Sequence, residues 1–143
     1  MAQTTATTFN FELVSPERRL LSEPARMVTI PGEEGHFGVL PGHSALVATI
    51  RPGVVEVHGA DGGDVRRIFI AGGFADVTST SCTILAEEAV NVSDLSLESL
   101  EKALGRLKED MSLTKDDIER SRVTRKINLV QAKIAAVSGK IAA

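Results

Sequence analysis

The side chains best suited to metal chemistry in this sequence are three histidines and a single cysteine. Imidazole nitrogen and thiolate sulfur are ligands that zinc prefers, usually at short and regular spacing. His36 and His43 lie seven residues apart across a proline, His58 lies further on, and no cysteine or pair of acids stands at ligand spacing beside them. Cys82 lies in an alternating apolar segment, which predicts a thiol in the core. We therefore expect no metal site.

The glycine-rich segment 32–42 (GEEGHFGVLPG) is the second candidate for chemistry, because glycine loops often bind phosphate. It matches neither GxGxxG nor GxxxxGK[ST], and no helical pattern follows it to supply a helix N-terminus. Ser44 follows His43, but no partner base and acid accompany them and the GxSxG motif is absent. The sequence therefore predicts no catalytic residue and no cofactor, and we expect that the chain is not an enzyme.

The composition excludes further classes of function. Aromatic residues make up 3% of the 143 residues, with no Trp and no Tyr, so the chain has no stacking platform for bases or sugars. No apolar run approaches the roughly 18 residues of a membrane-spanning helix. The N-terminal residues resemble neither a signal peptide nor a transit peptide, and a lone cysteine suits a reducing compartment. We expect a soluble intracellular protein.

Up to about residue 90 the apolar residues alternate with polar ones, as they do in Phe9, Phe11 and Leu13. Turn residues such as Pro and Gly recur every eight to twelve positions between these runs. The segment 61–63 (DGG) predicts a β-hairpin, and Gly72-Gly73 predicts a bulge or a close approach of two backbones. Short strands at this spacing predict an all-β sandwich or barrel, which we place over residues 1–91.

After residue 91 the apolar period changes to steps of three and four. One seam consists of Leu97, Leu100, Leu104, Leu107 and Met111, and the other of Val123, Ile127, Val130, Ile134, Val137 and Ile141. Such narrow seams, joined by a short connection, predict an antiparallel helical hairpin over residues 92–143. Ser96 is the expected N-cap of the first helix, and Thr114 with Asp117 the expected capping box of the second.

The charge differs between the two parts. Residues 1–95 carry six Lys and Arg against twelve Asp and Glu, a balance of −6, whereas residues 96–143 carry ten against seven, a balance of +3. The basic second helix has three interpretations, namely a solvated face, a nucleic-acid site and a docking site for an acidic protein. The acidic chain and the lack of aromatic residues disfavour nucleic acid. The other two interpretations stay open, and the residues alone slightly favour the solvated face.

Two segments resemble the epsilon subunit of F-type ATP synthases, which is called delta in mitochondria. They are residues 31–53 (PGEEGHFGVLPGHSALVATIRPG) and residues 70–90 (IAGGFADVTSTSCTILAEEAV). The first is similar to the family's EGxxGxLPGH loop with its following PG turn, and the second to its GGF strand and the strand after it. The resemblance implies an all-β sandwich of about ten strands followed by an antiparallel α-helical hairpin. It also implies a non-catalytic rotor subunit in the central stalk of the proton-translocating enzyme.

The same resemblance implies partners and contact residues, in each case at numbered positions of this sequence. The loop that would contact the ring of c subunits is Glu33, Glu34, Gly35, His36 and Phe37, and the loop on the side of the gamma subunit and the ring is Pro41, Gly42 and His43. In many bacterial members the hairpin blocks ATP hydrolysis by touching an acidic segment of the beta subunit. The basic residues placed for such a contact with beta, and with alpha, are Arg120, Arg122, Arg125 and Lys126.

Some members also bind ATP through an I/L-D-x-x-R-A stretch at the start of the first helix. Aligned on Leu95, this chain has Ser96 and Ser99 in place of the Asp and the Arg, so we expect no ATP-binding site. The implied location is peripheral, on the cytoplasmic face of a bacterial inner membrane. An extended and a folded hairpin are both compatible with the sequence. The alternative function is a stand-alone β-sandwich adaptor that docks its basic hairpin on an acidic protein.

Overall fold

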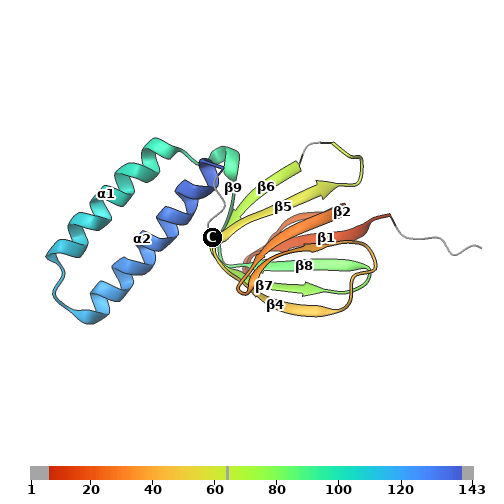
Figure 1. Cartoon of the computed structure of the whole chain (residues 1–143), viewed down its shortest axis with the longest axis horizontal. Coiled ribbons are helices and arrows are strands. Elements are labelled where there is room, and N and C mark those ends of the chain that lie inside the picture. Colours follow the sequence, from red (N-terminus) through yellow and green to blue (C-terminus); the bar gives the residue numbers. More distant parts are fainter. Residues whose placement is uncertain (1–6, 64, 140–143) are drawn as a thin grey trace, which may run out of the picture. The chain divides into compact units, whose positions relative to one another are not determined.

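The computed structural model describes residues 7–63 and 65–139, which divide into two compact units between Asn91 and Val92 (Figure 1). The first unit contains nine strands within the described residues. They are β1 (Phe9–Val14), β2 (Arg19–Gly32), β3 (Gly35–Val39), β4 (Leu46–Ile50), β5 (Gly53–Gly59), β6 (Val65–Ile70), β7 (Gly73–Val77), β8 (Ser81–Ala86) and β9 (Ala89–Asn91). The second unit contains a short 3-10 helix, η1 (Val92–Asp94), and two α-helices, α1 (Leu97–Leu113) and α2 (Asp117–Val137).

The strands form a sandwich in which the 14-residue strand β2 belongs to both layers. The first half of β2 pairs antiparallel with β1, and its second half pairs with β3 and β5. One layer continues from β1 through β8 and β7 to β4, and the other continues from β5 through β6 to β9. Figure 1 shows β1, β8, β7 and β4 side by side in one layer. The predicted sandwich is therefore confirmed, and so is the predicted hairpin between β5 and β6.

The core lies between the two layers and follows from the alternation of the strands. In β1 the side chains of Phe9, Phe11 and Leu13 point inward and are at most 4% exposed. Ile30 of β2, which is completely buried, belongs to the same cluster. Each buried side chain of this size contributes about 1.5–3 kcal/mol relative to an exposed one. No polar or charged residue among the described residues is buried as a whole, so the core of this unit is apolar.

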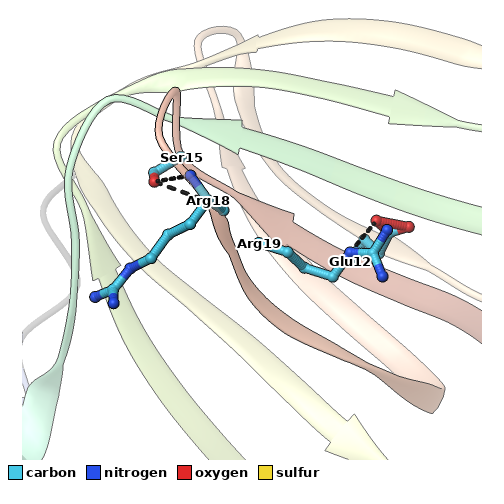
Figure 2. A network of polar contacts seen from close by, with 4 residues as sticks. All are labelled: Glu12, Ser15, Arg18 and Arg19. Carbon is cyan, nitrogen blue, oxygen red and sulfur yellow. Dashed lines mark hydrogen bonds and ion pairs between the residues drawn. The ribbon is translucent and has the colours of Figure 1, made fainter.

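The turn between β1 and β2 shows how a short polar connection is held (Figure 2). The backbone amide of Ser15 donates to the carbonyl of Arg18 at 2.9 Å, and the amide of Arg18 donates back to the carbonyl of Ser15 at 3.3 Å. The hydroxyl of Ser15 also donates to the carbonyl of Arg18 at 3.2 Å and accepts from the amide of Arg18 at 3.3 Å (Figure 2). Across the hairpin, Nε of Arg19 lies 3.2 Å from Oε1 of Glu12. This ion pair is solvent-exposed and contributes about 1 kcal/mol or less. The hairpin therefore depends on its backbone pairing and on the core.

The thiol of Cys82 is completely buried in β8, as the alternation predicts. Burial raises the pKa of this thiol to about 12, and the negative charge of Asp76 adds to the effect. Because a thiol reacts as its thiolate, we expect Cys82 of the folded chain to resist alkylation at about pH 8 and to react at the rate of unfolding. The folded chain keeps this thiol protonated to a higher pH than the unfolded chain does. The resulting contribution to the free energy of unfolding is complete below pH 9 and is lost as the pH rises towards about 12. The rate of alkylation of Cys82 by iodoacetamide is measured by mass spectrometry with and without urea. Rapid labelling without urea would contradict the expectation.

In the helical unit, α1 and α2 run antiparallel and pack along the two predicted seams, of which Ile141 lies outside the described residues (Figure 1). Val123 of α2 is 7% exposed, whereas the seam residues Leu100, Leu104 and Leu107 of α1 are partly buried. Ser96 caps α1 as predicted, because its Oγ accepts a hydrogen bond from the amide of Ser99 at 3.3 Å. No helix in residues 7–63 and 65–139 has both the length and the apolar character needed to cross a membrane.

The predicted capping box of the second helix is wrong. Thr114 is the C-cap of α1 and its Oγ1 donates to the carbonyl of Asp110 at 2.7 Å, so it is not available to cap α2. The N-cap of α2 is Asp116, which makes no side-chain capping bond. The reason is the length of α1, which continues to Leu113 and brings the hydroxyl of Thr114 over its own last turn. The carbonyl of Thr114 instead accepts Nη1 of Arg120 at 3.2 Å.

Candidate interaction surfaces

The turn between β2 and β3 carries the two acids that the sequence analysis assigned to a ring contact. We call Glu33 and Glu34, with the flanking Gly32 and Gly35, the acidic turn. The amide of Glu33 donates to the carbonyl of Thr49 in β4 at 3.0 Å, so the turn is attached to a second hairpin. A Cβ on Gly32 would lie 2.7 Å from the carbonyl oxygen of Gly35, which explains why glycine is needed for this tight connection. Both carboxylates are exposed and form no ion pair with a described residue.

A groove of about 320 Å³ runs between the acidic turn and β4. Its acidic side is formed by Glu33 and Glu34, and its apolar side by Phe37, Leu46 and Val47. A groove with one acidic and one apolar wall suits a partner segment that presents both a cation and an apolar side chain. Of the predicted segment 33–37, Glu33, Glu34, Gly35 and Phe37 line this groove, whereas His36 does not and contacts Arg51 instead.

Arg51 also lies at this turn, and it is not among the residues predicted from the sequence. Its Nη2 donates to Nδ1 of His36 at 3.2 Å, and its backbone amide donates to the carbonyl of Pro31 at 3.0 Å. The Nε of Arg51 is buried without a hydrogen-bond partner among the described residues. Such an unpaired donor costs about 1–3 kcal/mol. No signal in the sequence pointed to this residue, because its partner lies fifteen positions away.

The second predicted loop, Pro41 to His43, lies at the other end of β3 from the acidic turn. Gly42 has a φ of +83° and its amide donates to the carbonyl of Ser79, in the turn between β7 and β8, at 2.9 Å. The Nδ1 of His43 donates to the carbonyl of Ser44 at 2.8 Å, so the imidazole is held by its own loop. The structure therefore separates the two predicted loops by the whole length of β3.

The outer face of the layer of β4, β7 and β8 carries an apolar strip that sequence reasoning missed. The apolar strip consists of Val47, Phe74 and Leu85, which are 72%, 55% and 45% exposed. Phe74 pairs directly with Leu85 across β7 and β8, and Val47 also lines the groove beside the acidic turn. The sequence feature that could have revealed the strip is a large apolar residue at an outward-facing position of an alternating strand. Val47 lies opposite Asp76 and Phe74 opposite Thr49, so polar side chains stand beside the strip. Large apolar side chains exposed on one face of a sheet are typical of an interaction site.

The four basic residues predicted on the second helix do not form a single group. At about 100° per residue, Arg122, Arg125 and Lys126 share one face of α2 and form a basic patch, whereas Arg120 lies on another face. Arg122 is partly neutralised by Glu119, with Nη1 to Oε1 at 3.0 Å. Arg125 and Lys126 form no ion pair or hydrogen bond with a described residue, so their charges are available to a partner.

Among residues 7–63 and 65–139 no three His, Cys, Asp or Glu side chains gather as metal ligands would. The two units instead present an acidic turn, an apolar strip and a basic patch. Taken together, these features define a protein that acts by docking to other proteins, built from a β-sandwich and a helical hairpin.

The comparisons with known proteins specify which docking protein this is. A family model described as the beta-sandwich domain of the ATP synthase delta/epsilon chain matches residues 8–92. The chain is 46% identical over 134 residues to the ATP synthase epsilon chain of Rhodospirillum centenum, covering 91% of this chain and 92% of that one. It is 43% identical over 140 residues to the epsilon chain of Rhodospirillum rubrum, covering 97% and 100%. The chain belongs to the delta/epsilon family of ATP synthase subunits.

Solved structures agree with this assignment. A chain of the Euglena gracilis mitochondrial ATP synthase, in a structure of OSCP, F1 and the c-ring, superimposes with a TM-score of 0.83 at 28% identity, covering 94% of this chain and 84% of that chain. A chain from the Tetrahymena thermophila mitochondrial ATP synthase, in a structure of the central stalk and c-ring, superimposes with a TM-score of 0.67 at 12% identity and shares the fold. The resemblance found in the sequence is thus confirmed, and the chain is a non-catalytic rotor subunit of ATP synthase.

Proposed function

We propose that this chain couples the gamma subunit to the c ring through two adjoining surfaces of its β-sandwich, with the apolar strip against gamma and the acidic turn against the ring. The observation that carries the proposal is their continuity, because Val47 belongs both to the strip and to the groove beside Glu33 and Glu34. A subunit that transmits torque needs such contacts on one rigid body, and the strands are joined by continuous pairing.

The acidic turn suits a c ring whose polar loops are basic. The residues of this contact are Glu33, Glu34, Gly35, His36 and Phe37. Unpaired carboxylates attract cations over a Debye length and fix the register of the two surfaces. The second loop, Pro41 to His43, contacts gamma at the other end of β3. In this arrangement the chain lies on the cytoplasmic face of a bacterial inner membrane, as a peripheral part of the complex.

The test of the ring contact removes both charges of the acidic turn. In the assembled enzyme, Glu33→Gln with Glu34→Gln is expected to lower the number of protons pumped per ATP hydrolysed, while ATP hydrolysis itself continues. Proton pumping into inverted vesicles, followed by a fluorescent pH probe, measures the ratio. The matched control is Glu17→Gln with Glu87→Gln, which removes two exposed acids elsewhere on the same unit. Equal coupling in the two double variants would refute the ring contact.

The helical hairpin has a separate role in the proposal, which is inhibition of ATP hydrolysis. The basic patch suits an acidic segment of the beta subunit, with alpha as its neighbour, because Arg125 and Lys126 are exposed and without a described partner. Arg120 is the least suited of the four predicted contacts, because its Nη1 already donates to Thr114.

Removal of the hairpin tests this inhibition. A chain that ends after Asn91 is expected to assemble and to raise the rate of ATP hydrolysis. The variant Arg125→Glu with Lys126→Glu is expected to raise the rate in the same direction, because it reverses the charge of the patch. Arg106→Glu with Lys108→Glu makes the same change of charge on α1 and serves as the control. A hydrolysis rate that is the same with and without the hairpin would leave only the coupling role.

A further inference from the structure

Arg51 lies at the corner between β4 and β5 and is connected to both strands of the neighbouring hairpin. Its backbone amide donates to the carbonyl of Pro31, near the end of β2, at 3.0 Å. Its side chain extends to β3, where Nη2 donates to Nδ1 of His36 at 3.2 Å. Pro31 and His36 are themselves paired across β2 and β3. One residue therefore fixes both sides of the acidic turn to a corner of the sandwich.

The hydrogen-bond contacts of the Arg51 guanidinium are unusual for an arginine that lies beside two acids. Its Nε is buried without a partner among the described residues, although buried donors are normally hydrogen-bonded. No ion pair joins it to Glu33 or Glu34, although carboxylates are the preferred partners of arginine. Its terminal nitrogen instead binds an exposed imidazole. This arrangement leaves both carboxylates unpaired and available.

We propose that Arg51 is a positioning residue of the ring contact, and that its hydrogen bond to His36 holds the acidic turn with both carboxylates directed to a basic partner. The inference rests on the proposed function of the turn and adds the residue that holds it in place. Without this bond the turn keeps only backbone attachments to its neighbours, such as that of Glu33 to Thr49.

The bond requires an imidazole that carries no proton on Nδ1. Arginine has only N–H donors, so Nδ1 of His36 must be the acceptor. The bond therefore depends on the guanidinium as donor and on an acceptor at this position of β3.

Few other charged groups lie on the elements next to β3, and those that do have other contacts. β4 carries no charged residue in Leu46–Ile50. The nearby charged or titratable groups are Glu33 and Glu34 in the turn, Arg26 of β2, whose Nε donates to the carbonyl of Gly59 at 3.0 Å, and, on β5, His58 and Glu56, the latter paired with Arg67 at 3.3 Å. Among these groups, Arg51 is the one with a hydrogen bond to His36.

Hydrogen exchange of the full chain tests the inference with four variants, measured as protection factors of the amides of residues 33–37. Arg51→Met and His36→Ala both remove the bond and are expected to lower protection several-fold at about pH 8. The urea midpoint of Arg51→Met is expected not to fall, because the lost Nε had no partner. His36→Asn keeps an acceptor near the position of Nδ1 that cannot gain a proton. Arg51→Lys keeps the positive charge but lacks the planar guanidinium. It therefore shows whether the charge alone or the geometry of the guanidinium holds the turn.

Rescue by the conservative variant distinguishes positioning from a general structural role. His36→Asn is expected to keep most of the wild-type protection, because its amide oxygen can accept the bond from Arg51, whereas His36→Ala loses it. Wild-type protection in Arg51→Met would overturn the inference, and so would an equal loss of protection in His36→Asn and in His36→Ala.

Coupling in the assembled enzyme separates this inference from the proposed function. Arg51→Met is expected to lower the protons pumped per ATP, as Glu33→Gln with Glu34→Gln does. If the double glutamine variant couples normally, the role of the turn at the ring is refuted, and the protection factors alone decide whether Arg51 positions it. If the double variant uncouples and Arg51→Met does not, the ring contact stands and the positioning role is overturned.

Discussion

Replacing Gly73 by alanine is expected to lower the free energy of unfolding by roughly 2–6 kcal/mol, the largest effect of any single methyl group in the β unit. Gly73 begins β7 with a φ of +152°, a conformation that side chains rarely adopt. A Cβ there would overlap the carbonyl oxygen of Leu85, in the neighbouring strand β8. The overlap is with backbone, which cannot rotate away, so β7 and β8 would have to separate. The change would also displace Phe74, the centre of the apolar strip.

Urea denaturation followed by circular dichroism measures this effect. The matched control is Gly38→Ala, the same change within strand β3, where the nearest atom to an added Cβ is Sδ of Met27 at 4.0 Å. We expect the control to change the free energy of unfolding by about 1 kcal/mol or less. Similar midpoints for the two variants would show that the close approach of β7 to β8 is not a constraint on this fold.

Replacing Phe74 by alanine is expected to weaken binding to the gamma subunit about thirtyfold or more, while the chain stays folded. Phe74 is 55% exposed, and its neighbours in the strip are Val47 and Leu85. Aromatic residues at the centre of an apolar interface often contribute 2 kcal/mol or more, and each 1.4 kcal/mol corresponds to a tenfold change in affinity. Stability should change little, because an exposed cross-strand pair contributes about 0.2–1 kcal/mol.

Titration of the purified gamma subunit with the full chain measures the affinity. Val65→Ala is the control, because Val65 is an exposed apolar residue, at 40%, on β6 in the other layer of the sandwich. We expect the control to bind gamma as the wild type does. Equal affinities for the two variants would show that gamma binds elsewhere, and the apolar strip would then need another partner.

The change in apolar period was sufficient to predict a β part and a helical part, because strand and helix periods are properties of the local chain. The alternation of Phe9, Phe11 and Leu13 predicted their burial for the same reason. The cap at Ser96 follows from the residue type and the start of the seam. The cap at Thr114 was predicted wrongly, because two helices lie close to it and the sequence does not show which one ends there. The segments 31–53 and 70–90 were also sufficient to identify the family, because they combine several motifs in order.

The tertiary structure alone decided which side chains act together. Phe74 became part of an exposed strip only through the register that places it opposite Leu85 and Thr49. Arg51 reached His36 only because the corner between β4 and β5 lies beside the hairpin of β2 and β3. The acidic turn and the loop at His43 are close in sequence, yet an extended strand separates them by about 3.3 Å per residue. These relations depend on pairing between distant segments, which local periodicity does not encode, whereas residue types and local period were enough to predict a protein of two parts.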